Sequence, residues 1–180
     1  VVDFLEDSLY KDKISFAFLS APMLQIATKS FSSQEIDSCL KTSDKENKKY
    51  CPGQGDFNAQ TRQSDPRHEK YAKFRYTLNF DINHPELIAN GASLGWFKAA
   101  VKITKKIMLD ENLSKIKIPI VLSQHGQDEV VLPYNQNIFA SKVKNCELYK
   151  IADAIHCPRY MHDDISSRYF RKIIEFFDSH

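Results

Sequence analysis

Three short runs of apolar residues predict buried strands, at residues 14–22, 118–126 and 146–151. The first run is mostly apolar and ends at a proline, so we expect a strand that is buried on both faces. The second run is similar, whereas the third alternates more clearly between apolar and polar residues. A helix is expected at residues 135–143, and an amphipathic helix closes the chain at residues 165–177. The order strand, helix, strand, helix predicts parallel β-α units and therefore an α/β fold.

The first nine residues carry apolar side chains at helical spacing, at Val1, Phe4, Leu5 and Leu9. We therefore expect the chain to begin within an amphipathic helix that has these positions on its apolar face. No capping residue precedes the pattern, and natural domains rarely begin in this way, so we expect the sequence to start inside a longer protein. A secretory signal is not expected, because the segment has neither a basic stretch nor a small-residue cleavage site.

The middle of the chain interrupts the series of strands. Residues 30–69 are rich in Ser, Lys, Asp, Asn and Gln, and they are expected to form loops and short helices. Residues 94–109 then predict a helix, because apolar side chains recur along one side of it. A long insertion between parallel strands usually lies over the carboxyl ends of the sheet, where ligands bind.

Composition narrows the function classes without identifying one. The 180 residues are 42% hydrophobic and 27% charged, with a net charge of +2, and these values are ordinary for a globular protein. The balance excludes a strongly basic nucleic-acid-binding domain and an acidic disordered tail. Apolar runs stay well short of the ~18 residues that a membrane-spanning helix requires. The five glycines are few for a complete enzyme, since average usage is about 7%.

Two side chains with catalytic potential follow the ends of the second and third predicted strands. Asp128 comes just after a glycine turn at the end of the second strand, and His156 lies in the loop after the third. Because the carboxyl ends of parallel strands meet at one edge of the sheet, we expect the two side chains to lie within hydrogen-bonding distance. A carboxylate in that place fixes the tautomer of the imidazole and stabilises its protonated form. His125, beside the turn, is expected to be a neutral group near this pair.

Several segments, in collinear order, resemble α/β-hydrolases of the lysophospholipase and monoacylglycerol lipase group, often called serine aminopeptidase-like hydrolases. Residues 18–24, FLSAPML, resemble the LSAPM run at the end of a strand in that group, and residues 61–71 resemble part of its lid. Residues 83–96 are similar to a later lid stretch with proline, glycine and tryptophan. Residues 118–128 resemble the strand that leads to the acid. Residues 154–156 resemble the segment with the histidine, with alanine where the group usually has glycine.

The resemblance implies the C-terminal part of an α/β-hydrolase parallel sheet with an inserted, mostly helical lid. Residues 1–21 are then the end of a helix and a core strand, residues 22–114 the lid, and residues 115–180 the C-terminal core. It implies a serine hydrolase that cleaves carboxylic esters of monoacylated lipids, lysophospholipid or monoacylglycerol, through an acyl-enzyme. Asp128 is then the acid of the triad and His156 its general base. No cofactor and no metal is implied.

The resemblance places the serine nucleophile on a G-x-S-x-G elbow between a buried strand and a helix. Residues 91–95, GASLG, match that pattern, but residues 81–90 before them are polar and contain a proline. The interval from Ser93 to Asp128 is also too short for another strand and the lid. We therefore interpret Ser93 or Ala92 as a helix cap. The nucleophile and the first half of the oxyanion hole are expected upstream of Val1.

Six apolar residues of the expected lid either line an acyl or alcohol pocket or pack the lid against the core. They are Phe74, Tyr76, Leu78, Phe80, Trp96 and Phe97. The expected partner is therefore a small lipid ester, and no nucleic acid is expected.

The four cysteines do not have the spacing of a zinc site. Cys39 and Cys51 either form a disulfide across the lid loop or remain free thiols in a reducing compartment. Cys157 adjoins His156, but neighbouring loop residues rarely face one another, so we do not expect a Cys-His nucleophile.

Two further functions remain open from the sequence. One is an aminopeptidase of the same fold that cleaves amides, in which Glu69 or Glu86 would bind a free amine. The other is a module without catalysis that acts in binding or interaction.

Lysines at positions 41, 45, 48 and 49 form either a solvated loop or a contact with an anionic membrane surface. We expect a cytoplasmic location or one peripheral to the membrane.

Overall fold

The computed structural model describes residues 1–7, 9, 11–26 and 31–180. Residues 8, 10 and 27–30 lie outside the described residues; residue 8 falls in the expected first helix and residues 27–30 fall in the expected lid. The chain forms two compact units. The first comprises Val1–Ala27, Val101–Pro158 and Asp163–His180, and the second comprises Thr28–Ala100 and Arg159–His162. The limits of the lid that we expect from the sequence, 22 and 114, stay a prediction.

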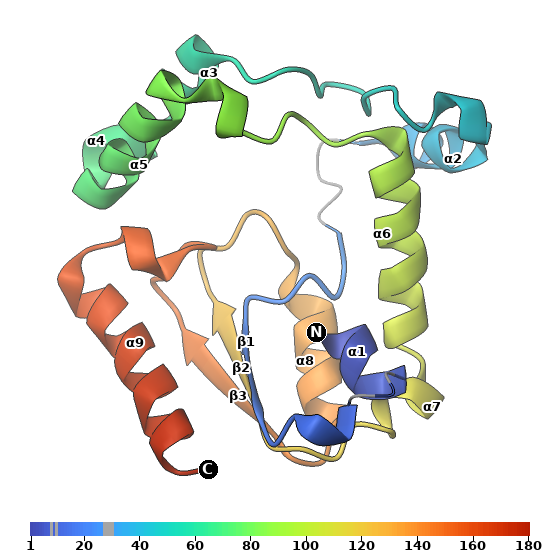
Figure 1. The fold of residues 1–180 in the computed structure, drawn as a ribbon, viewed down its shortest axis with the longest axis vertical. Coiled ribbons are helices and arrows are strands. Elements are labelled where there is room, and N and C mark those ends of the chain that lie inside the picture. The colour runs from blue at the N-terminus through green and yellow to red at the C-terminus, as the bar shows by residue number, and fades with distance from the viewer. Residues whose placement is uncertain (8, 10, 27–30) are drawn as a thin grey trace. The chain divides into compact units, whose positions relative to one another are not determined.

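The first unit is built on a parallel sheet (Figure 1), whose described strands are β1 (Ala17–Ser20), β2 (Ile120–His125) and β3 (Cys146–Ile151). The strands follow one another in chain order across the sheet, and both pairs are parallel. Leu122 of β2 lies in register with Leu19 of β1 and with Leu148 of β3. The predicted α/β fold with parallel strands is therefore confirmed.

Helices connect and cover these strands. The helical segments of the first unit are α1 (Val2–Asp7), η1 (Lys11–Lys13), α7 (Asp110–Leu113), α8 (Pro133–Lys142) and α9 (Asp163–Asp178). It also contains the end of α6 (Leu94–Ile107) and the start of η4 (Pro158–Tyr160). Proline opens α8 at its first position, where the missing N–H costs no hydrogen bond. The helices expected at 135–143 and 165–177 are thus confirmed as α8 and α9, with slightly different ends.

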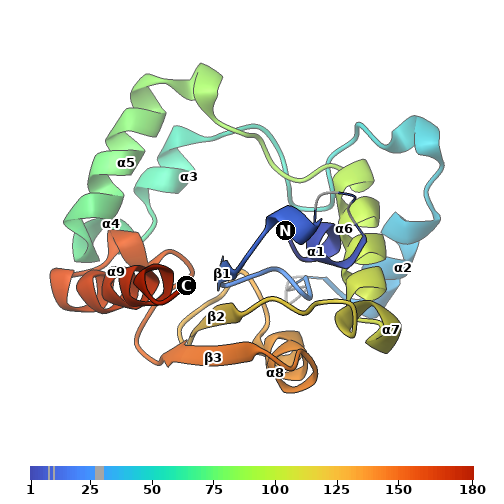
Figure 2. The same cartoon turned by 60° about the horizontal axis from the view of Figure 1, so that its bottom comes forward.

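The helices α8 and α9 cover opposite faces of the sheet (Figures 1 and 2). Successive side chains of a strand point to opposite faces. Leu19 of β1 and Phe139 of α8 belong to one core cluster of buried residues. Phe18, which precedes Leu19 in β1, points to the opposite face of the sheet. Its ring lies edge-on to the ring of Tyr169 of α9, with centroids 5.8 Å apart. The sheet therefore has an apolar layer on each side.

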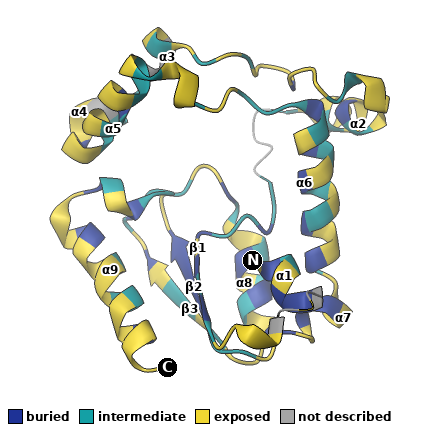
Figure 3. Ribbon diagram, viewed as in Figure 1, coloured by how far each residue is buried: buried dark blue, intermediate teal, exposed yellow. Residues whose placement is uncertain are grey.

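Burial differs between the first two strands (Figure 3). Every residue of β2 is buried, as the sequence predicts for a central parallel strand. In β1, Ala17 and Leu19 are buried, but Phe18 is half-buried and Ser20 is exposed. The expectation of burial on both faces of the first strand is therefore wrong. The apolar run predicts a strand, but how far that strand is buried depends on the elements beside it. β2 has a paired strand on each side.

The apolar face of the first helix also differs from the expectation. Among the described side chains of α1, Val2, Leu5 and Glu6 are buried, whereas Val1 and Leu9 are exposed. The reason is that α1 ends at Asp7, so Leu9 lies beyond the helix. In α9, Phe176 packs edge-on against Phe16 with ring centroids 5.5 Å apart.

The second unit is mostly helical. Its elements are α2 (Ser33–Lys41), η2 (Asp44–Glu46), α3 (Ala59–Gln63), α4 (Arg67–Lys70), α5 (Ala72–Asn83) and η3 (Pro85–Leu87), together with the start of α6 (Leu94–Ile107). A capping box between Ser32 and Glu35 fixes the start of α2. Lys98 of α6 donates to the carbonyl of Thr42 at 2.6 Å and to Oδ1 of Asn47 at 2.9 Å. The helix predicted at 94–109 is confirmed as α6. Among the described residues, no helix has both the length and the apolar character that crossing a membrane requires.

Candidate active site

Hydrogen bonds between backbones join the two loops that carry Asp128 and His156. After β2, the N–H of Gly126 donates to the carbonyl of Ile151 at 3.0 Å. The next N–H, that of Gln127, donates to the carbonyl of Ala154 at 2.9 Å. The loop after β2 and the loop after β3 are therefore held together beyond the ends of their strands, which places their side chains at one edge of the sheet.

The two side chains singled out in the sequence form a hydrogen bond. Nδ1 of His156 lies 2.8 Å from Oδ2 of Asp128. The Asp128 side chain is 4% exposed, whereas that of His156 is 31% exposed. An ionised carboxylate can accept but not donate, so Nδ1 of His156 carries the proton. In the neutral ring Nε2 is then unprotonated and able to take a proton from another group.

The second oxygen of Asp128 is also fully engaged. Oδ1 accepts the N–H of Val130 at 2.8 Å and the N–H of Val131 at 3.1 Å. Burial raises the pKa of Asp128, but the hydrogen bonds from His156, Val130 and Val131 outweigh burial, so the pKa lies below its usual value. The carboxylate is therefore ionised and oriented at neutral pH, as a partner of an imidazole base must be.

The sequence did not predict that a serine hydroxyl lies beside His125. Ser123 of β2 is completely buried, and its Oγ lies 2.9 Å from Nε2 of His125. Residues two apart in a strand share one face of the sheet, so the pattern places Ser123 and His125 on one side. It gives no signal that the hydroxyl and the imidazole make a hydrogen bond.

Ser93 belongs to the second unit and precedes α6. Its Oγ accepts the N–H of Trp96 at 3.2 Å, three residues further on. This is the hydrogen bond of a helix N-cap. The interpretation of Ser93 as a cap is therefore confirmed.

The apolar residues expected in a lid pocket differ in burial. Leu78 and Phe97 are buried, whereas Tyr76, Phe80 and Trp96 are half-exposed or more. Phe97 packs in the second unit against Phe31, with ring centroids 6.2 Å apart. Their role in binding a substrate stays a prediction.

The described part of the chain holds its cysteines as free thiols, so a disulfide between Cys39 and Cys51 is not formed in this structure. Both thiols are buried in the second unit. Burial and the neighbouring Cys39 raise the pKa of Cys51. In the described ranges, no three His, Cys, Asp or Glu side chains are grouped as a metal site.

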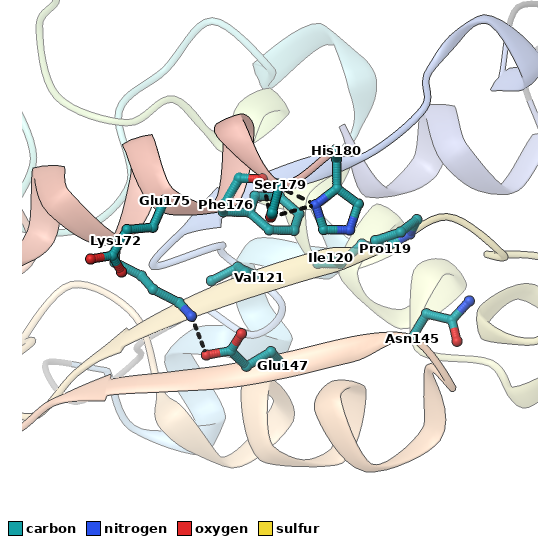
Figure 4. Close-up of a pocket in the computed structure, with 10 residues that line it drawn as sticks. All are labelled: Pro119, Ile120, Val121, Asn145, Glu147, Lys172, Glu175, Phe176, Ser179 and His180. Carbon is teal, nitrogen blue, oxygen red and sulfur yellow. Dashed lines mark hydrogen bonds and ion pairs between the residues drawn. The ribbon is translucent and has the colours of Figure 1, made fainter.

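The first unit also contains a cavity of about 280 Å³ (Figure 4), and neither Asp128 nor His156 lines it. It is lined by residues before and at the start of β2 and β3 and by the end of α9, such as Pro119, Asn145 and Ser179. Lys172 points toward Glu147 across it and forms an ion pair at 2.6 Å. Asp128 and His156 lie at the opposite ends of these strands, so this cavity does not contain the candidate active site.

Comparisons with known proteins support the fold. No family model and no curated protein matches the chain. Among solved structures, the chain is similar to the monoacylglycerol lipase of Paleococcus ferrophilus, with 18% identity and a TM-score of 0.68 over 99% of this chain and 63% of that one. A soluble variant of the monoglyceride lipase of Saccharomyces cerevisiae, in complex with a substrate analog, has 13% identity and a TM-score of 0.72 over 99% and 60%. The enol-lactonase of Burkholderia xenovorans has 12% identity and a TM-score of 0.57 over 98% and 60%.

The chain spans about three fifths of the length of these enzymes, since 60–63% of each is matched. Their sequence identities are low, so the likeness concerns the fold and not the substrate. The parallel sheet and its helices, together with this likeness over almost the whole chain, show the fold of part of an α/β-hydrolase.

Proposed function

We propose that this chain carries the acid and the base of a serine hydrolase that cleaves carboxylic esters. The observation that carries the proposal is the hydrogen bond between Nδ1 of His156 and Oδ2 of Asp128, at 2.8 Å beyond the ends of two adjacent parallel strands. A buried, ionised carboxylate that orients a more exposed imidazole is the arrangement that activates a hydroxyl nucleophile.

In the proposed reaction, Nε2 of His156 takes the proton from a serine Oγ while that oxygen attacks the ester carbonyl carbon. The Asp128 carboxylate stabilises the imidazolium that forms. His156 then gives the proton to the departing alcohol, which leaves an acyl-serine. Water, deprotonated by the same imidazole, attacks the acyl carbon and releases the carboxylic acid, and the serine regains its proton.

We place the serine and the first half of the oxyanion hole in polypeptide that precedes Val1, as the resemblance of the sequence implies. Ser93 is assigned to the cap of α6 because its hydroxyl oxygen accepts the Trp96 N–H. The substrate we propose is a monoacylated lipid, a monoacylglycerol or a lysophospholipid. This proposal for the substrate rests on the sequence resemblance and on the likeness of the fold to two monoacylglycerol lipases.

The test compares this chain with the longer product of its natural reading frame. We expect the longer protein to hydrolyse monoacylglycerol or lysophospholipid and the 180-residue chain to hydrolyse neither. His156→Ala in the longer protein should lose most of kcat, by about 10⁴-fold or more. His84→Ala is the matched control, because this histidine lies in the second unit at a partly exposed site beside Glu86.

Three outcomes would contradict the proposal. Full turnover by the His156→Ala protein would remove His156 from the base role. Absence of a G-x-S-x-G elbow from the upstream reading frame would remove the nucleophile. Cleavage of amino-acid amides in preference to esters would instead support the aminopeptidase alternative.

A further inference from the structure

His125, the last residue of β2, is a buried polar side chain that the proposed reaction does not use. It is 3% exposed and lies between two polar groups of the first unit. Its Nε2 is 2.9 Å from Oγ of Ser123, and its Nδ1 is 3.2 Å from the backbone carbonyl oxygen of His156. The second contact matters because it involves the same residue whose ring pairs with Asp128.

The partners of His125 determine its tautomer. A carbonyl oxygen can accept but not donate, so Nδ1 of His125 must carry a proton to make that hydrogen bond. In the neutral ring Nε2 is then an acceptor, and the hydroxyl of Ser123 donates to it. Both nitrogens of the buried ring and the carbonyl of His156 therefore have partners.

Burial keeps this ring neutral. Burial, and to a smaller extent the neighbouring His156 imidazole, lowers the pKa of His125. Together they outweigh the charge of Asp128 and the hydrogen bonds to the carbonyls of His156 and Ile155, which raise it. The ring of Tyr169, on α9, lies edge-on to the imidazole with centroids 6.0 Å apart. With the Tyr169 ring and the Ser123 hydroxyl beside it, the His125 ring is oriented so that Nδ1 faces the carbonyl oxygen of His156.

We propose that His125 is a positioning residue, which holds the backbone of His156 while Asp128 holds its ring. His156 is then fixed at two points, its carbonyl oxygen and its Nδ1. The loop that carries it has no regular structure between Ile151 and Pro158, so these hydrogen bonds and those at Gly126 and Gln127 determine its path. The inference rests on the proposed function for the chemical task of His156, but the geometry can be tested without turnover.

Two substitutions of His125 test whether its hydrogen bond to the His156 carbonyl matters, or whether any polar side chain would serve at this buried site. In His125→Asn, the side-chain amide nitrogen takes the place of Nδ1 and can still donate to the His156 carbonyl. In His125→Gln, the amide lies one bond further along, nearer to Ser123 than to that carbonyl. Both variants are neutral and polar, so they share the cost of placing an amide in the interior.

The measurement is NMR of histidine imidazoles labelled with ¹⁵N in the 180-residue chain. In the unsubstituted chain we expect His125 as the Nδ1–H tautomer, and an Nε2–H tautomer would overturn the proposal before any variant is made. The exchange of the His156 Nδ1 proton with water should stay within about threefold in His125→Asn and rise about tenfold in His125→Gln, the change expected for one net hydrogen bond. Equal protection in the two variants would also overturn it.

Kinetics of the longer reading-frame product then connects the geometry to the reaction. His125→Gln should lower kcat about tenfold with little change in KM, and His125→Asn should restore most of it. A similar fall in kcat in both variants would assign His125 to folding rather than to positioning. If the NMR result holds but the longer protein cleaves no ester, the proposed function fails while the hydrogen-bonded arrangement stands.

Discussion

The backbone of Gly126 lies so close to Ala152 that a β-carbon at Gly126 would stand 2.2 Å from the carbonyl oxygen of Ala152. No side chain fits at that distance, so the two loops can approach because residue 126 is a glycine. The contact is made where the Gly126 N–H also donates to the Ile151 carbonyl at 3.0 Å. Glycine at this position therefore brings the loop of Asp128 next to the loop of His156.

Gly126→Ala should consequently separate these loops. We expect the free energy of unfolding to fall by about 1–3 kcal/mol, the usual cost of forcing a methyl group into a packed site. Thermal or denaturant unfolding measures this loss. Exchange of the His156 Nδ1 proton should also become faster, because its bond to Asp128 lengthens.

Gly55→Ala is the matched control for this substitution. A β-carbon on Gly55 would have no atom within 4 Å, so stability should change by less than about 0.5 kcal/mol. Equal stability of the two alanine variants would show that the loops can separate without cost.

The hydrogen bonds of Asp128 predict a specific loss of stability in acid. Its pKa in the folded chain lies below the ordinary value of 3.8 because His156, Val130 and Val131 donate to it, although burial acts in the other direction. The unfolded chain therefore binds a proton more readily than the folded chain in this range. The contribution to stability is present above pH ~4 and is lost as the pH falls toward the lowered pKa.

Asp128→Asn should remove this contribution. We expect the variant to be about 1–3 kcal/mol less stable than the unsubstituted chain at pH 6, with a difference that shrinks toward pH 3. Unfolding in urea at several pH values measures it. Asp153→Asn is the control, since Asp153 pairs with Arg168 at 2.7 Å on the surface and is 48% exposed. A constant difference across the pH range for Asp128→Asn would contradict the assignment.

The sequence predicts most of the sheet and the pairing of Asp128 with His156, because both follow from short-range patterns. A buried run predicts β2, and the order of strand ends places the two side chains at one edge of the sheet. The hydrogen bond between Ser123 and His125 could not be predicted in the same way. The imidazole also packs edge-on against the ring of Tyr169, which lies far along the chain, and local patterns do not reveal such contacts.

Local pattern is a poor guide to residues 74–80 for a related reason. Phe74, Tyr76, Leu78 and Phe80 alternate with other residues, as in a half-buried strand. They nevertheless lie on a helix, α5, in which Leu78 is buried while Tyr76 is largely exposed. The alternating apolar residues therefore do not correspond to one buried face. Propensity alone does not determine whether such a segment forms a strand or a helix.

The core between β1, β2 and α8 predicts a large effect of a single truncation. Phe139 of α8 is completely buried and packs in the cluster that contains Leu19 and Leu122. Phe139→Ala should lower the free energy of unfolding by about 3–5 kcal/mol, as the lost transfer energy and the remaining cavity add. Tyr134→Ala, on the same helix but 67% exposed, should change it by less than about 1 kcal/mol. Similar losses for the two variants would contradict the assignment of α8 to the core.

Ser93 distinguishes a structural serine from a nucleophile. Its Oγ accepts the N–H of Trp96 at 3.2 Å and caps α6, so Ser93→Ala should lower stability by about 1 kcal/mol. Ser93→Asp or Ser93→Asn should restore most of that loss, because either side chain can accept the same N–H. In the longer reading-frame product, all three variants should keep the turnover of the unsubstituted protein. A nucleophile would show the reverse pattern, with hydrolysis lost in every variant whatever the stability, so measuring both quantities decides between the two roles.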